Sequence, residues 1–123
     1  TGTCVPQVPE GTSLEDAVKE INRLELGVTL VIRPDKTLAG IITDGDLRRL
    51  IADKKSIVDL TVEDVMTINP RTVTLNSQAY DALNMMEKHQ ITVLPITNAE
   101  GIVQGIIHLH DILGKGEFKF NGT

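Results

Sequence analysis

The chain is poor in aromatic residues and has no long apolar stretch. Only 2% of its 123 residues are aromatic although 41% are hydrophobic, so the core must be built from Ile, Val and Leu. No apolar run approaches the roughly 18–20 residues that cross a bilayer, and no signal-peptide pattern opens the chain. We therefore expect a soluble protein that does not bind membranes.

Cysteine and basic residues are also scarce. Cys4 is the single cysteine, so it forms no internal disulfide, which fits a reducing compartment and a cytoplasmic location. The net charge of −5 argues against a nucleic-acid surface, which needs clustered Lys and Arg. Anionic small ligands are compatible with this charge, because backbone amides and a few cations hold them locally.

What the sequence does contain is an internal repeat. Thr12–Leu47 aligns without a gap with Ser77–Ile112, an offset of 65 positions, and the hydrophobic pattern matches almost throughout. "GIITDGDL" in the first copy corresponds to "GIIHLHDI" in the second. The alignment indicates a duplication. Because a copy of roughly 55–60 residues buries little surface alone, we expect the two copies to share a core.

Each copy predicts the element order β-α-β-β-α. Ser13 followed by Asp16 predicts a helix start, and Ser77 is the expected cap of the matching helix. Short strands are expected before these helices, in "CVPQV" and "PRTVTL". Strands "VTLVI" and "LAGII", and "TVLPIT" and "IVQGII", are expected to form hairpins through the turns "RPDK" and "NAEG". Second helices are expected to start near Asp44 and near Leu109.

The predicted fold class is α+β, with two β-α-β-β-α repeats related by pseudo-twofold symmetry and their sheets packed together. We place the first repeat at 1–53, a connector at 54–66, and the second repeat with a C-terminal tail at 67–123. In the connector, Thr61 is expected to cap a short helix through Asp64. The repeat puts the counterpart of "DVM" before Thr1, so we expect a truncated leading edge and a piece of a longer enzyme.

The strand-to-helix corner of the first copy carries residues with ligand chemistry. A helix N-terminus offers free amide groups and the positive end of the helix dipole, both of which favour phosphate. Thr43 can donate its hydroxyl to a phosphoryl oxygen, and Asp46 can accept both hydroxyls of a ribose. Arg48 and Arg49 follow and can supply cations. A simpler interpretation stays open, in which Thr43 caps the helix and Asp46 favours its dipole.

In the second copy, His108 and Asp111 replace Thr43 and Asp46. A histidine still donates to phosphate, and its charge changes near neutral pH, so we expect the two corners to differ. His108, His110 and Asp111 also suggest a metal, but no further cluster completes a ligand set, and we assign no metal. No nucleophile-and-base arrangement or P-loop spacing is present, so we assign no catalytic residue.

The segments "DVMTINPRTVTLNSQAYDAL", "ITVLPITNAEGIVQGIIHLHD" and "GIITDGDL" resemble a tandem pair of cystathionine-β-synthase (CBS) domains, a Bateman module, over essentially the whole chain. The resemblance implies a regulatory module with clefts between the copies that often hold adenosyl nucleotides. It places the family's ribose aspartate at Asp46 and Asp111 and its phosphate threonine at Thr43; His108 departs from that pattern. The expected ligand-binding residues are Ile42, Thr43, Asp46, Arg48, Ile107, His108 and Asp111.

"TDGDLRR" with "HLHDILGKG" is similar to the C-terminal CBS pair of the D-arabinose 5-phosphate isomerases of bacterial Kdo and lipopolysaccharide synthesis. In that family a sugar-isomerase domain precedes the pair. The resemblance implies an aldose–ketose isomerase as the parent chain, and allosteric regulation by a nucleotide or nucleotide-sugar such as CMP-Kdo, AMP or ATP, with no resident cofactor. Two alternatives stay open: a CBS pair regulating another parent, such as a transporter, channel or nucleotide dehydrogenase, or a purely structural dimerisation module.

We also expect a homodimer formed through the CBS modules, and a tetramer is an option for the full-length protein. Apolar residues on the second helices are expected to help cover the neighbour. These residues are Leu47, Leu50, Ile51, Ile112 and Leu113.

Overall fold

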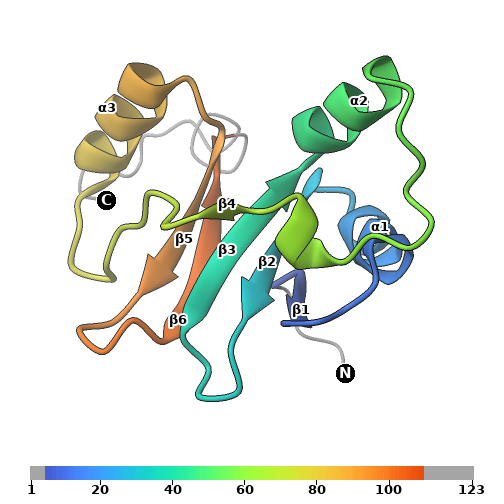
Figure 1. Cartoon of the computed structure of the whole chain (residues 1–123). Coiled ribbons are helices and arrows are strands. Elements are labelled where there is room, and N and C mark those ends of the chain that lie inside the picture. The colour runs from blue at the N-terminus through green and yellow to red at the C-terminus, as the bar shows by residue number, and fades with distance from the viewer. Residues whose placement is uncertain (1–4, 110–123) are drawn as a thin grey trace. The chain divides into compact units, whose positions relative to one another are not determined.

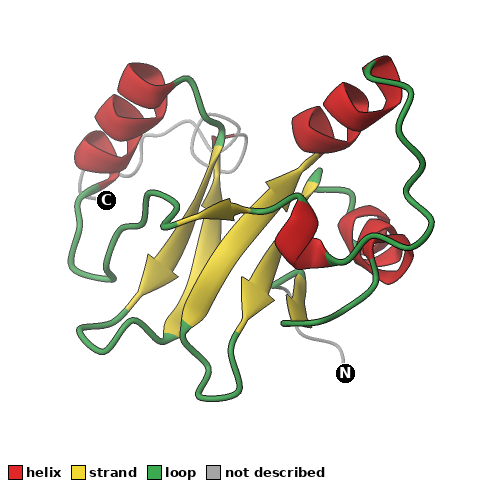
Figure 2. Cartoon of the chain, in the orientation of Figure 1, coloured by secondary structure: helices red, strands yellow, loops and turns green. Residues whose placement is uncertain are grey.

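The structure is a computed structural model, and it describes residues 5–109 (Figure 1). The chain divides into two compact units, Thr1–Pro70 and Arg71–Thr123. Each unit combines helices with a β-sheet (Figure 2), so the α+β class with two repeats is confirmed. None of the described helices is long and apolar enough to cross a membrane.

The first unit is a four-stranded sheet with helices. Its sheet has the order β1-β2-β3-β4, in which β1 runs parallel to β2 and the other neighbouring pairs are antiparallel. Its elements are β1 (Gln7–Pro9), α1 (Leu14–Arg23), β2 (Val28–Ile32), β3 (Leu38–Thr43), α2 (Asp44–Ala52), the 3₁₀ helix η1 (Val62–Asp64) and β4 (Thr67–Ile68).

Helix α1 begins where the sequence predicts. The Ser13 hydroxyl accepts a hydrogen bond from the Asp16 amide at 3.1 Å, which satisfies one of the free donors of the first turn. Leu14, Ala17 and Ile21 recur at helical spacing and are buried. Helix α1 therefore turns one apolar stripe inward.

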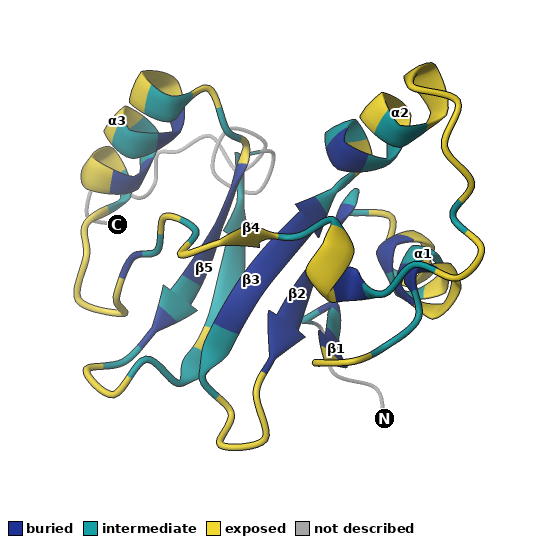
Figure 3. Cartoon of the chain, in the orientation of Figure 1, coloured by how far each residue is buried: buried dark blue, intermediate teal, exposed yellow. Residues whose placement is uncertain are grey.

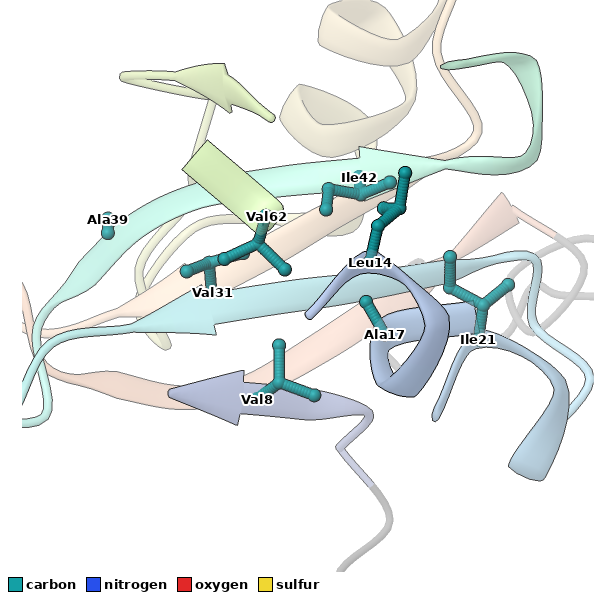
Figure 4. Close-up of a cluster of buried hydrophobic side chains, with 8 residues drawn as sticks. All are labelled: Val8, Leu14, Ala17, Ile21, Val31, Ala39, Ile42 and Val62. Carbon is teal, nitrogen blue, oxygen red and sulfur yellow. The ribbon is translucent and has the colours of Figure 1, made fainter. Parts of the chain in front are cut away.

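One core cluster joins α1, η1 and the sheet of the first unit (Figure 4). Leu14, Ile42 and Val62 are fully buried in it, and β2 is buried along its whole length (Figure 3). Leu47 and Leu50 pack against this cluster. The cluster consists of Val8, Leu14, Ala17, Ile21, Val31, Ala39, Ile42 and Val62.

The packing of α2 bears on the expected dimer surface, which stays a prediction. Leu47 and Leu50 contact the core of their own unit, because α2 lies with these residues toward the cluster. Ile51 is 69% exposed and is the member of that set with a solvent-facing side chain among the described residues. Ile112 and Leu113 lie outside the described residues.

The second unit contains α3 (Ala79–His89), β5 (Val93–Thr97) and β6 (Val103–His108), with β5 and β6 antiparallel. Its core cluster consists of Val73, Ala82, Met86 and Leu94. A second helix is predicted to start near Leu109: Leu109 is helical directly after β6, and the residues that follow it lie outside the described range.

Strand register confirms the duplication residue by residue. Val28 pairs with Thr43 and Val93 with His108, each pair offset from the other by the 65 positions of the sequence repeat. Both hairpins carry a register shift at the matching place, between Val31 and Ile32 and between Ile96 and Thr97. The two copies therefore share one backbone pattern despite their low identity.

Two local predictions for the second copy are wrong. Helix α3 is capped by Gln78 and not by Ser77, whose hydroxyl accepts instead from the Thr74 amide at 3.1 Å. The strand predicted in "PRTVTL" is reduced to a single parallel bridge from Val73 to Ile96. Ser77 therefore closes the turn that begins at Thr74, and α3 begins one residue later than the sequence predicts.

The connector behaves as predicted at Thr61. The Thr61 amide donates to Asp64 at 2.8 Å, and η1 follows directly. Beyond it, β4 pairs with β3, with Ile68 opposite Gly40 and Thr67 opposite Ile41.

Candidate ligand-binding corners

The first corner is a direct passage from strand to helix. Strand β3 ends at Thr43 and α2 begins at Asp44, and the Asp44 amide donates to the Gly27 carbonyl at 2.9 Å, across the mouth of the hairpin. The hairpin register thus fixes where the N-terminus of α2 lies. The functional side chains are carried by this fixed backbone.

Thr43 and Asp46 form a reciprocal capping box. The Thr43 amide donates to Asp46 Oδ2 at 2.9 Å, and the Asp46 amide donates to Thr43 Oγ1 at 3.4 Å. The Thr43 hydroxyl also lies 3.3 Å from Asp46 Oδ2. These are the contacts of the helix-cap interpretation. Both predicted site residues therefore already have a structural role.

Asp46 is a buried carboxylate with donors on both oxygens. The residue is 8% exposed, and its Oδ1 accepts a charge-assisted hydrogen bond from Arg49 Nη2. Arg49 itself is an exposed partner, with 72% of its side chain accessible. From the sequence, Arg49 was expected only to supply a cation to a ligand. Its i,i+3 spacing from Asp46 also favours an ion pair between the two side chains on one helix.

Gly45 leaves a small space that three donors approach. A β-carbon at this position would lie 3.6 Å from both Arg49 Nη1 and Thr43 Oγ1, and 3.8 Å from Arg48 Nη2. Arg48, predicted from the sequence, and Arg49 thus both reach back toward the N-terminus of α2. Two guanidinium groups and a hydroxyl beside a helix N-terminus suit an anionic group.

Ile42 and Ile107 lie next to the corners but belong to the cores. Ile42 is fully buried in the first core cluster, and Ile107 packs against the second. Their side chains support the strand ends. Asp44 lies against Gly27, whose φ of +74° and missing β-carbon make room for it, since a β-carbon there would be 2.7 Å from Asp44 Oδ2.

The second corner repeats the backbone with different side chains. The Leu109 amide donates to the Thr92 carbonyl at 2.7 Å, as Asp44 does to Gly27, and His108 takes the position of Thr43. Asp111, predicted to match Asp46, lies outside the described residues. Within residues 5–109 no group of three or more His, Cys, Asp or Glu side chains is placed to hold a metal ion.

The family model for the CBS domain matches residues 3–53 and 62–116. These two matches cover most of the chain and both copies of the repeat. The chain therefore belongs to the CBS domain family and carries two CBS domains.

Curated relatives include enzymes. The arabinose 5-phosphate isomerase KdsD of Yersinia pestis is 40% identical over 116 residues, which cover 94% of this chain and 35% of the relative. The chain thus spans about a third of the length of the curated relatives that it matches.

Solved structures show the same fold. A CBS domain protein from Pyrobaculum aerophilum, complexed with AMP, matches with a TM-score of 0.85 at 18% identity, over 98% of this chain and 91% of that chain. The CBS domain pair of protein MJ0100, in complex with 5'-methylthioadenosine and S-adenosyl-L-methionine, has a TM-score of 0.81 at 23% identity, over 92% of this chain and 88% of that chain.

Proposed function

We propose that this chain is the regulatory, ligand-binding CBS pair of an arabinose 5-phosphate isomerase of Kdo and lipopolysaccharide synthesis. The observation that carries the proposal is the 40% identity to KdsD over 94% of the chain. In this proposal the isomerisation belongs to the parent chain, and the CBS pair adjusts it. The parent would act in the cytoplasm, as a homodimer joined through its CBS modules.

The proposed ligand is a nucleotide or a nucleotide-sugar. The related structures that hold AMP, and 5'-methylthioadenosine with S-adenosyl-L-methionine, support a ligand that contains ribose. At the first corner Asp46 would accept the ribose hydroxyls, while Arg48 and the N-terminus of α2 would hold the phosphate beside Thr43. CMP-Kdo is the effector to test first, because feedback on an early step requires a sensor for a late product. His108 and Asp111 would serve the second corner.

A second candidate function is a purely structural dimerisation module. It is favoured by the capping box, since Thr43 and Arg49 engage both oxygens of Asp46 within one stretch of chain. In that case the corner residues would only hold α2 in place. Ile51, at 69% exposure, would then be a candidate contact with a neighbour.

Ligand titration of the 123-residue chain separates the two functions. CMP-Kdo, AMP and ATP are each titrated by calorimetry and added in thermal-shift assays. A ligand present at about 100 times its Kd adds about 2.7 kcal/mol to the free energy of unfolding. A regulatory module predicts binding of at least one of them. No heat and no thermal shift with any of the three would contradict the proposal.

Asp46→Ala tests the first corner, and Asp64→Ala is its matched control. Both carboxylates accept from the backbone amide of the threonine three residues before them, at 2.9 Å for Asp46 and 2.8 Å for Asp64. Each variant should lose about 1 kcal/mol of capping stabilisation. Only Asp46→Ala should weaken nucleotide binding, by about tenfold or more, because hydrogen bonds to a charged group are lost. Equal affinity in both variants would refute Asp46 as the ribose acceptor.

A further inference from the structure

The guanidinium group of Arg49 reaches two places at the first corner. Its Nη2 holds Asp46 Oδ1, and its Nη1 lies 3.6 Å from the point where a β-carbon on Gly45 would be. One end of this group therefore neutralises the proposed ribose acceptor. The other end borders the space where the corner offers donors to an anion.

The two oxygens of Asp46 are not equally available to a ligand. Oδ2 already accepts from the amide and the hydroxyl of Thr43, at 2.9 and 3.3 Å, which uses the two acceptor positions of that oxygen. A ribose hydroxyl must therefore take Oδ1, the oxygen that Arg49 holds. Arg49 uses one of the two acceptor positions of Oδ1, which leaves one position for two ribose hydroxyls. While Thr43 keeps its bonds to Oδ2, a diol that binds through both hydroxyls therefore needs the position that Arg49 occupies.

We infer that Arg49 makes the first corner selective for anionic nucleotides over neutral nucleosides, by exchanging Asp46 for the anionic group of the ligand. The inference rests on the proposed function and names the ligand class at that site. A neutral nucleoside breaks the Asp46–Arg49 pair and gives the guanidinium no new partner. A ligand with a phosphate beside Gly45 supplies one within reach of the same side chain.

The exchange is inexpensive because Arg49 is exposed. With 72% of its side chain accessible, water already solvates the guanidinium, and an exposed ion pair changes an equilibrium constant by only about two- to fivefold. Arg48 differs: its Nη2 approaches the same space, at 3.8 Å, and in the described part of the chain it is Arg49 that pairs with Asp46. The two arginines should therefore respond differently to the same substitution.

The test measures the affinities of the 123-residue chain for two matched pairs, AMP with adenosine and CMP with cytidine, by calorimetry. Arg49→Gln is compared with Arg48→Gln and with Lys55→Gln, which removes the same charge from an exposed position after α2. Circular dichroism melting establishes that each variant is folded.

Arg49→Gln should bind the nucleoside about two- to fivefold more tightly and the nucleotide about tenfold or more weakly, because charge-assisted hydrogen bonds to phosphate are lost. Arg48→Gln should weaken binding of the nucleotide only, and Lys55→Gln should leave the ratio of nucleotide affinity to nucleoside affinity unchanged. If this ratio for Arg49→Gln lies within about twofold of its value for the unaltered chain, the inference is overturned while the proposed function stands. If the unaltered chain binds none of the four compounds, the inference fails, whereas the proposed function fails only if CMP-Kdo and ATP do not bind either.

Discussion

The two CBS domains share a backbone and differ where the chemistry lies. Their hairpins have matching register and a matching bulge, and their turns place Lys36 and Gly101 at φ values of +76° and +83°. At the corner, however, Thr43 becomes His108 and Asp44 becomes Leu109. Hairpin hydrogen bonds fix the position of the helix start, so the side chains there can change without altering the fold.

The ends of the first helices show the same equivalence. Glu25 and Gln90 occupy matching positions and both are left-handed, with φ values of +57° and +56°. Neither residue is glycine, so each copy accepts some backbone strain in order to end the helix before β2 or β5. The shared geometry indicates that the duplicated fold, and not the residue type, imposes this conformation.

The largest expected difference between the units lies at Gly40 and Gly105. A β-carbon on Gly40 would be 2.8 Å from the Thr67 carbonyl oxygen and 2.7 Å from Met66 Sδ, whereas on Gly105 the nearest described atom is Ile96 Cδ1 at 3.7 Å. Gly40→Ala should therefore cost about 1–3 kcal/mol by pushing β4 from β3. Gly105→Ala should be close to neutral. Urea denaturation measures both, and equal losses would contradict the difference.

The N-caps of α1 and α3 give the next effect. Ser13 caps α1 through its side chain, whereas Gln78 makes no side-chain cap bond at α3. Ser13→Ala should therefore cost about 1 kcal/mol, and Gln78→Ala should change stability little. Gln78→Asp should stabilise α3 by supplying the missing acceptor. Thermal denaturation of the three variants checks this, and a loss in Gln78→Ala as large as in Ser13→Ala would be inconsistent with it.

The hairpin turns predict a smaller, reciprocal effect. Lys36 and Gly101 occupy the same turn position with positive φ, and this conformation is strained for Lys36 but not for Gly101, which has no β-carbon. Lys36→Gly should stabilise the first unit by a few tenths of a kcal/mol to about 1 kcal/mol, and Gly101→Lys should destabilise the second by about 1 kcal/mol. The measurement is the denaturation midpoint of each variant. Shifts of the same sign in both would show that the two turns are not equivalent.

The smallest effect is a pH dependence confined to α3. Desolvation, followed by the charges of Arg71 and Lys88, lowers the pKa of His89 below its usual value of 6.5. The unfolded chain then takes up the proton more readily, so this contribution is intact above about pH 6.5 and is lost as the pH falls through that value. The Tm of the unaltered chain should fall more between pH 7.5 and 5.5 than that of His89→Gln. If the Tm of the two proteins changes equally with pH, His89 is not the cause of the pH dependence.

A second pH-dependent contribution to stability lies in the first unit, at lower pH. The hydrogen bond from Arg23 and that from the Gln7 amide outweigh the effect of burial and lower the pKa of Glu20 below 4.5. A carboxyl group whose pKa is lowered in the folded state stabilises the fold at pH values above its pKa in the unfolded chain. This stabilisation is lost as the pH drops through its pKa in the folded state. The two units therefore lose these contributions in different pH ranges.

The sequence by itself determined the repeat, the two hairpins and the corner. Their signals are local: an apolar period of 3.6 or 2, turn residues, and a Thr-x-x-Asp pattern that serves a helix start whatever surrounds it. The hairpins over 28–43 and 93–108 and the start of α2 at Asp44 accordingly lie where the pattern predicts. The CBS family could be inferred from the order and spacing of these segments.

Only the tertiary structure decided which partners meet. Ser77 has the right residue type for a cap, but its hydroxyl accepts from the Thr74 amide and the cap is Gln78. Leu47 and Leu50 look available for a neighbour, but both are partly buried against the core of their own unit. Arg49 pairs with Asp46 because the two residues are three positions apart on α2, and the Arg49 side chain reaches back toward Gly45. In each case several residues are chemically able to form the contact. The sequence pattern indicates which residues these are, while the packing of the folded chain decides which of them is close enough to form it.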